Sequence, residues 1–192
     1  MGENLIHDFS TLVDDLTARI RPLAIGRYAF FGHSMGALLA YGCASRLVER
    51  GAPSPLALAV AAAAAPSRRV RTNAAGKSEA ELIADLRRFN GAPDFLFDDP
   101  QMLALTLETL AADYDVCASF KSRSASQLNC RIFVYGGEKD AIAEYDLAAW
   151  SCESLKETSI SMFSGGHFFL REQEKLFLKK LLSDISSAFS VN

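Results

Sequence analysis

The chain has 192 residues, enough for one domain with its own hydrophobic core. Apolar residues make up 49% and charged residues 22%, and the formal net charge of −3 is not gathered into blocks, which argues against a nucleic-acid partner. Four scattered cysteines and three histidines predict reduced thiols, no metal site and a cytoplasmic protein, and no apolar stretch approaches the ~20 residues that cross a membrane.

The first third of the chain alternates between helical and strand patterns. Apolar residues at helical spacing predict an amphipathic helix over residues 5–20. The short apolar run 28–31 stops at Gly32 and is typical of a buried strand. Residues 35–50 then predict a helix, and residues 56–60 predict a second buried strand.

The middle of the chain changes character, because strand patterns are missing from residues 66–127. Two helical patterns, near residues 79–89 and 101–120, flank a Gly-Ala-Pro break. Strand patterns then resume, each followed by a Gly-containing turn and a helix: strands at 131–135 and 158–163, and helices near 145–155 and 168–189.

This order of elements predicts an α/β protein, with one domain over residues 1–192. Buried strands that alternate with helices form a parallel sheet covered by helices on both faces. The helical segment of about 66–127 is inserted between the second and third strands. Because parallel sheets bind ligands at the carboxyl ends of their strands, we expect this insertion to form a lid over a site there.

Gly32-His-Ser-Met-Gly36 fits the G-x-S-x-G pattern of a nucleophile elbow, with a predicted strand before it and a helix after it. Such a turn holds its serine on a strained backbone, and both glycines are expected to avoid Cβ collisions. We predict that Ser34 is a nucleophile and that the backbone N–H of Met35 stabilises an oxyanion. The alternative is an ordinary Gly-rich turn.

A serine hydroxyl needs a base, and the chain offers three histidines. His7 precedes the elbow, whereas folds built around such an elbow carry their catalytic residues in the order serine, acid, histidine. The side chain of His33 is expected to leave the turn in another direction. His167 lies in Gly165-Gly-His-Phe-Phe169, past the last predicted strand, where a slender loop can bring its imidazole over Ser34.

The acid that orients the imidazole should lie between Ser34 and His167 in the sequence. The segment Tyr135-Gly-Gly-Glu-Lys-Asp140 follows the third predicted strand and offers two carboxylates. We favour Asp140, at the far end of the turn, and keep Glu138 as the alternative.

Together these motifs resemble the type II thioesterases, the free-standing editing enzymes of polyketide and non-ribosomal peptide assembly lines. The resemblance implies an α/β-hydrolase fold in which Ser34, Asp140 and His167 form the catalytic triad. It implies a substrate acyl group on the phosphopantetheine arm of an acyl or peptidyl carrier protein, with no cofactor of the enzyme's own. It rests on these segments: Phe31–Ala37, Asn90–Pro93, Ala112–Tyr114, Tyr135–Asp140, Trp150 and Gly165–Leu170.

Members of that family carry further strands before the nucleophile strand, and a loop there supplies a second oxyanion N–H. The resemblance therefore implies a chain that is truncated at its N-terminus. Residues 28–31 would then form an apolar edge strand, able to self-associate. We expect such a chain alone to be oligomeric or poorly soluble, and slow.

Two further groups of residues are candidates for substrate and partner contacts. Arg68, Arg69 and Arg71 open the insertion and could contact an acidic carrier protein, or form an ordinary solvated face. Apolar side chains of the insertion could line an acyl pocket, or pack onto the body: Phe95, Leu96, Phe97, Met102 and Leu103.

Two other functions stay open at this point. The same three residues could serve an esterase or an acyltransferase, which differ from a thioesterase in substrate or in the exclusion of water. A truncated hydrolase could also bind a carrier protein with little or no turnover.

Overall fold

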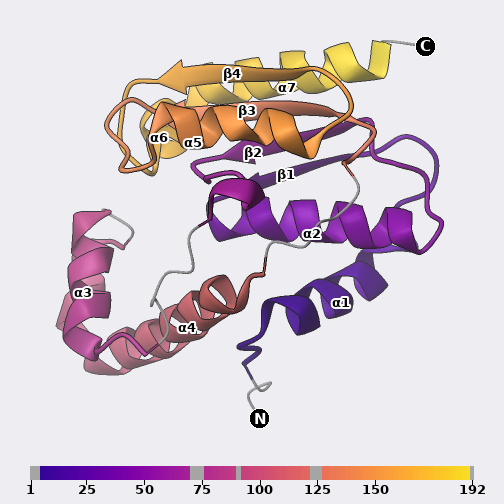
Figure 1. Cartoon of the computed structure of the whole chain (residues 1–192). Coiled ribbons are helices and arrows are strands. Elements are labelled where there is room, and N and C mark those ends of the chain that lie inside the picture. Colours follow the sequence, from indigo (N-terminus) through magenta and orange to yellow (C-terminus); the bar gives the residue numbers. More distant parts are fainter. Residues whose placement is uncertain (1–4, 70–75, 90–91, 122–126, 191–192) are drawn as a thin grey trace. The chain divides into compact units, whose positions relative to one another are not determined.

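The computed structural model describes residues 5–69, 76–89, 92–121 and 127–190 (Figure 1). The chain divides into two compact units. The smaller unit comprises Met1–Leu12 and Val70–Lys121, and the larger comprises Val13–Arg69 and Ser122–Asn192.

The larger unit contains a sheet of four parallel strands in the order β1-β2-β3-β4 (Figure 1). His33 lies level with Ala61, and Ala61 with Tyr135, so the carboxyl ends of the strands share one edge of the sheet. Among the described residues, β1 and β4 are the edge strands. The strands are β1 (Ala29–His33), β2 (Ala57–Ala61), β3 (Arg131–Gly137) and β4 (Thr158–Phe163).

The two central strands are buried on both faces, as their continuous apolar sequences predict. Strand β2 sends Leu58 and Val60 into one core cluster and its alanines into another, because successive side chains point to opposite faces. The first cluster contains Trp150, whose indole N–H donates to the Ala63 carbonyl at 2.8 Å. The second places phenylalanines, among them Phe169 and Phe177, with the alanine face of β2.

Helices pack on both faces of the sheet, which confirms the α/β prediction. Helix α2 contributes to the first cluster with α5 and the short 3-10 helix η3, while α6 and α7 contribute to the second. Expected as one helix, residues 168–189 form two, which are separated at Gln173. The bounds are α2 (Met35–Glu49), α5 (Glu144–Ala148), η3 (Ala149–Glu153), α6 (Phe169–Glu172) and α7 (Glu174–Ser190).

The remaining elements are helical. Helix α1 (Phe9–Ile20) and the 3-10 helix η1 (Pro66–Arg68) flank the first two strands in the sequence. The described residues between Pro66 and Lys121 contain no strand, as predicted. Their helices in the smaller unit are α3 (Glu79–Arg88), η2 (Asp94–Asp98) and α4 (Pro100–Ser119).

Local capping explains where the two longer helices of the smaller unit begin. Ser78 and Glu81 form a reciprocal capping box at the start of α3. The Asp99 carboxylate accepts the backbone N–H groups of Gln101 and Met102 at the start of α4, beside Pro100 in the first turn. None of the helices in the described ranges is both long enough and apolar enough to cross a membrane.

Candidate active site

Three of the predicted site residues meet at the carboxyl edge of the sheet, all within the larger unit. Ser34 lies in the turn between β1 and α2, Asp140 follows β3, and His167 follows β4. Nε2 of His167 is 2.9 Å from Oγ of Ser34, and Nδ1 is 2.9 Å from Oδ2 of Asp140. The parallel arrangement brings these side chains together because each one follows the carboxyl end of a strand.

The backbone of Ser34 is strained, as a nucleophile elbow requires. Its φ of 54° and ψ of −120° lie where residues with a Cβ rarely occur, at a cost of about 1–3 kcal/mol. The Ser34 N–H donates to the Ala61 carbonyl at 2.8 Å, which fixes the turn to β2. Although Ser34 occupies the N-cap position of α2, its hydroxyl makes no capping bond and is directed to His167 instead.

The two glycines of the elbow differ in what they permit. A Cβ at Gly32 would lie 2.1 Å from the backbone oxygen of Gly36, so no side chain fits there. A Cβ at Gly36 would meet no atom within 4 Å. The expectation that both glycines avoid a collision is therefore wrong for Gly36, because that residue already lies in the first turn of α2 with its Cβ direction open.

The loops that carry the acid and the base are bonded to each other. The Lys139 N–H donates to the Gly165 carbonyl and the Glu138 N–H to the Phe163 carbonyl, both at 2.9 Å. A Cβ at Gly137 would lie 2.3 Å from the Gly166 carbonyl oxygen. The two loops can approach this closely only because Gly137 has no side chain.

We expect the substitution Gly137→Ala to destabilise the protein by about 1–3 kcal/mol, since backbone atoms must move to admit the new methyl group. It should also slow any reaction that depends on the spacing of Asp140 and His167. Gly166→Ala is the matched control, because a Cβ there meets nothing within 4 Å. Thermal unfolding of both variants measures the difference, and equal midpoints would contradict the steric argument.

Asp140 is held as an anion. Its side chain is only 3% exposed, and burial alone would raise its pKa. The hydrogen bond and charge of His167 and the backbone N–H groups of Ala141 and Ile142 outweigh that effect, so the pKa of Asp140 lies below its ordinary value. Glu138, the alternative acid, is exposed and accepts a hydrogen bond from Oγ of Ser164 at 3.0 Å.

An ionised carboxylate can only accept hydrogen bonds, which fixes the protons of the site. Nδ1 of His167 must carry the proton in its bond to Asp140. In the neutral imidazole, Nε2 is then unprotonated and accepts the hydroxyl proton of Ser34. The arrangement can therefore draw a proton from the serine and stabilise the imidazolium that results.

The predicted oxyanion donor, Met35, is the first residue of α2. The first N–H groups of a helix have no acceptor within that helix, and they attract negative charge. The backbone of Met35 is thus suited to the predicted role, which stays a prediction.

His33 is the residue whose position sequence reasoning missed. Its Nε2 lies 2.8 Å from the backbone carbonyl oxygen of His167, and the two rings are 5.1 Å apart. Burial lowers the pKa of His33, although the bond to this carbonyl acts in the opposite direction. Its place next to Ser34 was visible in the sequence, but no local pattern shows which loop a strand-end side chain will meet.

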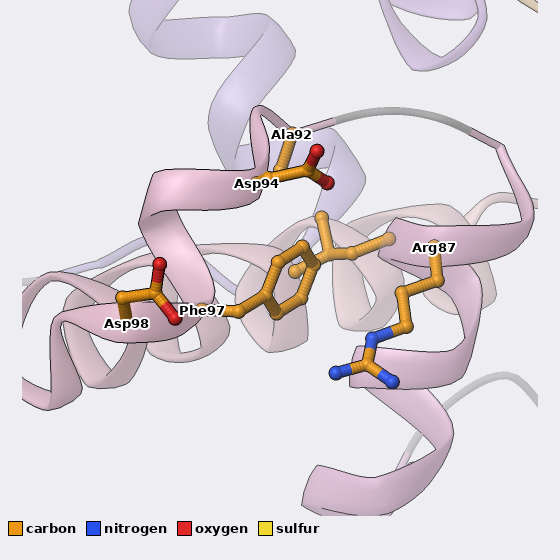
Figure 2. A pocket seen from close by; sticks show the side chains of 6 residues that line it. Arg87, Ala92, Asp94, Phe97 and Asp98 are labelled. Carbon is orange, nitrogen blue, oxygen red and sulfur yellow. The ribbon is translucent and has the colours of Figure 1, made fainter.

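The predicted acyl-pocket residues all lie in the smaller unit. Leu96 is buried, whereas Phe95 and Met102 are 64% and 47% exposed. Phe97 lines a cavity of about 360 Å³ together with Arg87 and Asp98 (Figure 2). The Arg87 guanidinium lies 4.9 Å from the centre of the Phe97 ring. Leu103 is partly buried in α4. Their role as an acyl pocket, and that of the insertion as a lid, stay predictions.

The arginines proposed to contact a partner are only partly described. Arg68 is exposed at the end of η1, and Arg69 follows it. Arg71 lies outside the described residues.

The parallel sheet, the strained elbow and the hydrogen-bonded side chains at its carboxyl edge define an α/β-hydrolase fold. Residues 1–189 match the family model of the thioesterase domain, and the chain belongs to this family.

Three of the similar proteins are named for biosynthetic pathways. The gramicidin S biosynthesis protein GrsT of Aneurinibacillus migulanus is 32% identical over 165 residues, which cover 85% of this chain and 64% of GrsT. The type II thioesterase BorB of the borrelidin biosynthetic cluster is 31% identical with a TM-score of 0.84, over 94% of this chain and 74% of BorB. The thioesterase RedJ of the prodiginine pathway in Streptomyces coelicolor is 27% identical with a TM-score of 0.82, over 90% of this chain and 71% of RedJ. The chain thus spans less than two thirds of the length of GrsT.

Proposed function

We propose that this chain hydrolyses acyl thioesters through an acyl-enzyme intermediate on Ser34. The observation that carries the proposal is the unbroken series of hydrogen bonds from Ser34 through His167 to Asp140. Membership of the thioesterase family supports a thioester as the bond that is cleaved.

In the acylation half of the cycle, His167 takes the hydroxyl proton while Oγ of Ser34 attacks the thioester carbonyl carbon. The oxygen of the tetrahedral intermediate carries the negative charge, and the proposal assigns the N–H of Met35 to bind it. When the intermediate collapses, the C–S bond breaks, the thiol leaves with the proton held by His167, and the acyl group stays on Ser34.

In the deacylation half, His167 removes a proton from water, and the resulting hydroxide attacks the acyl ester. The C–O bond to Ser34 then breaks, and His167 returns its proton to the serine oxygen. A free acid leaves, and the site is restored. Because the three side chains supply nucleophile, base and acid, the proposal assigns no cofactor.

We further propose that the thioester is presented on the phosphopantetheine arm of an acyl or peptidyl carrier protein. The names of the similar proteins place them in gramicidin S, borrelidin and prodiginine biosynthesis, which supports a synthase-bound substrate. The exposed Arg68, which follows β2 in the sequence, is a candidate contact for an acidic carrier.

The test compares one acyl group in three forms: on a carrier protein, on a small thiol, and as an oxygen ester. We expect kcat/KM to be highest for the carrier-bound thioester, because carrier contacts add binding energy that the small thiol lacks. Release of free thiol or acid measures each rate. A preference for the oxygen ester would replace the thioesterase by an esterase, and equal rates for both thioesters would remove the carrier protein from the proposal.

A further inference from the structure

The proposed base is joined to the nucleophile turn by two separate hydrogen bonds. One is the bond between Nε2 of His167 and Oγ of Ser34, at 2.9 Å, which the reaction itself uses. The other joins Nε2 of His33 to the backbone carbonyl oxygen of His167, at 2.8 Å. Since His33 and Ser34 are consecutive residues, the second bond ties the backbone of His167, through the His33 side chain, to the residue that precedes the nucleophile.

The loop that carries His167 needs such a restraint. Residues 164–168 belong to neither a helix nor a strand. On one side the Gly165 carbonyl accepts the Lys139 N–H, which anchors the loop to the acid. Two residues further along the loop, the bond from His33 anchors the His167 carbonyl to the elbow, so the base is held from both sides.

The rings around this bond also restrict the position of His33. The Phe168 ring lies 5.2 Å from the His33 ring and stands perpendicular to the His167 ring at 5.4 Å. The Arg171 guanidinium covers Phe168 at 4.8 Å from its centre. Because these rings already restrict the His33 side chain, it loses little conformational entropy when it makes its hydrogen bond.

The acceptor defines the protonation of His33. A carbonyl oxygen only accepts, so Nε2 of His33 must carry a hydrogen and donate it. Burial lowers the pKa of His33, which favours the neutral ring. The electrostatic effects of His167 and Arg171 act in the same direction, whereas the bond to the His167 carbonyl and the charge of Asp140 oppose it. A neutral His33 adds no positive charge that would disfavour the imidazolium of His167.

We infer that His33 is a positioning residue: its Nε2–H, bonded to the His167 carbonyl oxygen, holds the base in line with Oγ of Ser34. The inference rests on the proposed function, because it assumes that His167 activates Ser34. Its effect comes from geometry, since a displacement of about 1 Å in a reacting pair can cost about 10²-fold in rate.

Two variants that carry the same amide group test whether the bond to the His167 carbonyl matters, or whether any polar side chain at position 33 is enough. In His33→Gln the amide nitrogen can reach the place of Nε2, whereas in His33→Asn it reaches only the place of Nδ1. The readout is labelling of Ser34 by a fluorophosphonate, which requires an activated serine but no knowledge of the substrate. We expect His33→Asn to lower the maximal labelling rate by about 10- to 100-fold, with the half-saturating probe concentration unchanged, and His33→Gln to retain the rate within about threefold.

Equal losses in the two variants would overturn the inference, because the ring and not its Nε2–H would then matter. Rates equal to that of the parent in both variants would also overturn it. If the Ser34→Ala variant were labelled as fast as the parent, the probe would not be reacting at Ser34, and the proposed function itself would fail. The Nδ1 proton of His167, observed by NMR, gives a second readout: its signal should stay sharp in His33→Gln and broaden through exchange in His33→Asn.

Discussion

Replacing Ser34 with alanine should lower thioester turnover by about 10⁶-fold while the protein stays folded. In the proposed mechanism the substitution removes the oxygen that forms the acyl-enzyme, and a water molecule cannot take its place with the same alignment. Alanine at this position bears the same φ of 54°, so the backbone strain is unchanged and only the bond to His167 is lost. Turnover of the carrier-bound thioester measures the first effect, and thermal unfolding measures the second.

Ser151→Ala is the matched control, because that hydroxyl is exposed and donates to the Ala148 carbonyl within its own turn. It should keep full activity. A Ser34→Ala variant with activity within tenfold of the parent would remove Ser34 from its proposed role.

The second large effect is expected from Asp140→Asn, which should lower turnover by about 10⁴-fold. The asparagine amide can donate to Nδ1 of His167 and so favour the wrong tautomer, in which Nε2 carries the proton and cannot accept the one from Ser34. Glu138→Gln is the control, since its carboxylate bonds Ser164 and is exposed. A large loss in Glu138→Gln with normal activity in Asp140→Asn would exchange the two assignments.

The same substitution has a pH-dependent effect on stability. Because the native pKa of Asp140 lies below its ordinary value, the stabilisation that it provides is present above the unfolded pKa of about 3.9. That stabilisation is lost as the pH falls through the native pKa. The advantage of the parent over Asp140→Asn in unfolding free energy should therefore shrink in acid.

Most elements of the fold could be predicted from the sequence, since their patterns are local. The run Ala57–Ala61 is apolar at every position and forms a strand buried on both faces. The ends of elements were harder to place. Strand β3 continues to Gly137 because its last two residues pair with Met162 and Phe163, and the partner strand is not visible in a local pattern.

The candidate site shows the same division between local and distant information. The place of Ser34 in a turn between a strand and a helix could be predicted because its motif, strand and helix are contiguous. The choice between Glu138 and Asp140 depended on the path of the turn, which is hydrogen-bonded to the distant loop of Gly165. The contact of His33 with His167 joins residues 134 positions apart, and nothing near His33 in the sequence encodes it.

The long separation between the nucleophile and the base has a consequence for the growing polypeptide. Ser34 and His167 are 133 residues apart, whereas Asp140 and His167 are separated by 27. A ribosome adding about 5–20 residues per second therefore exposes the serine for several seconds before the histidine exists. During that time the hydroxyl has no base and stays unreactive. Closing so large a loop within a parallel sheet is also a slow step in folding. In the proposed mechanism, the chain therefore gains its reactivity only when the sheet is assembled, and a nascent copy without His167 should show no thioester cleavage.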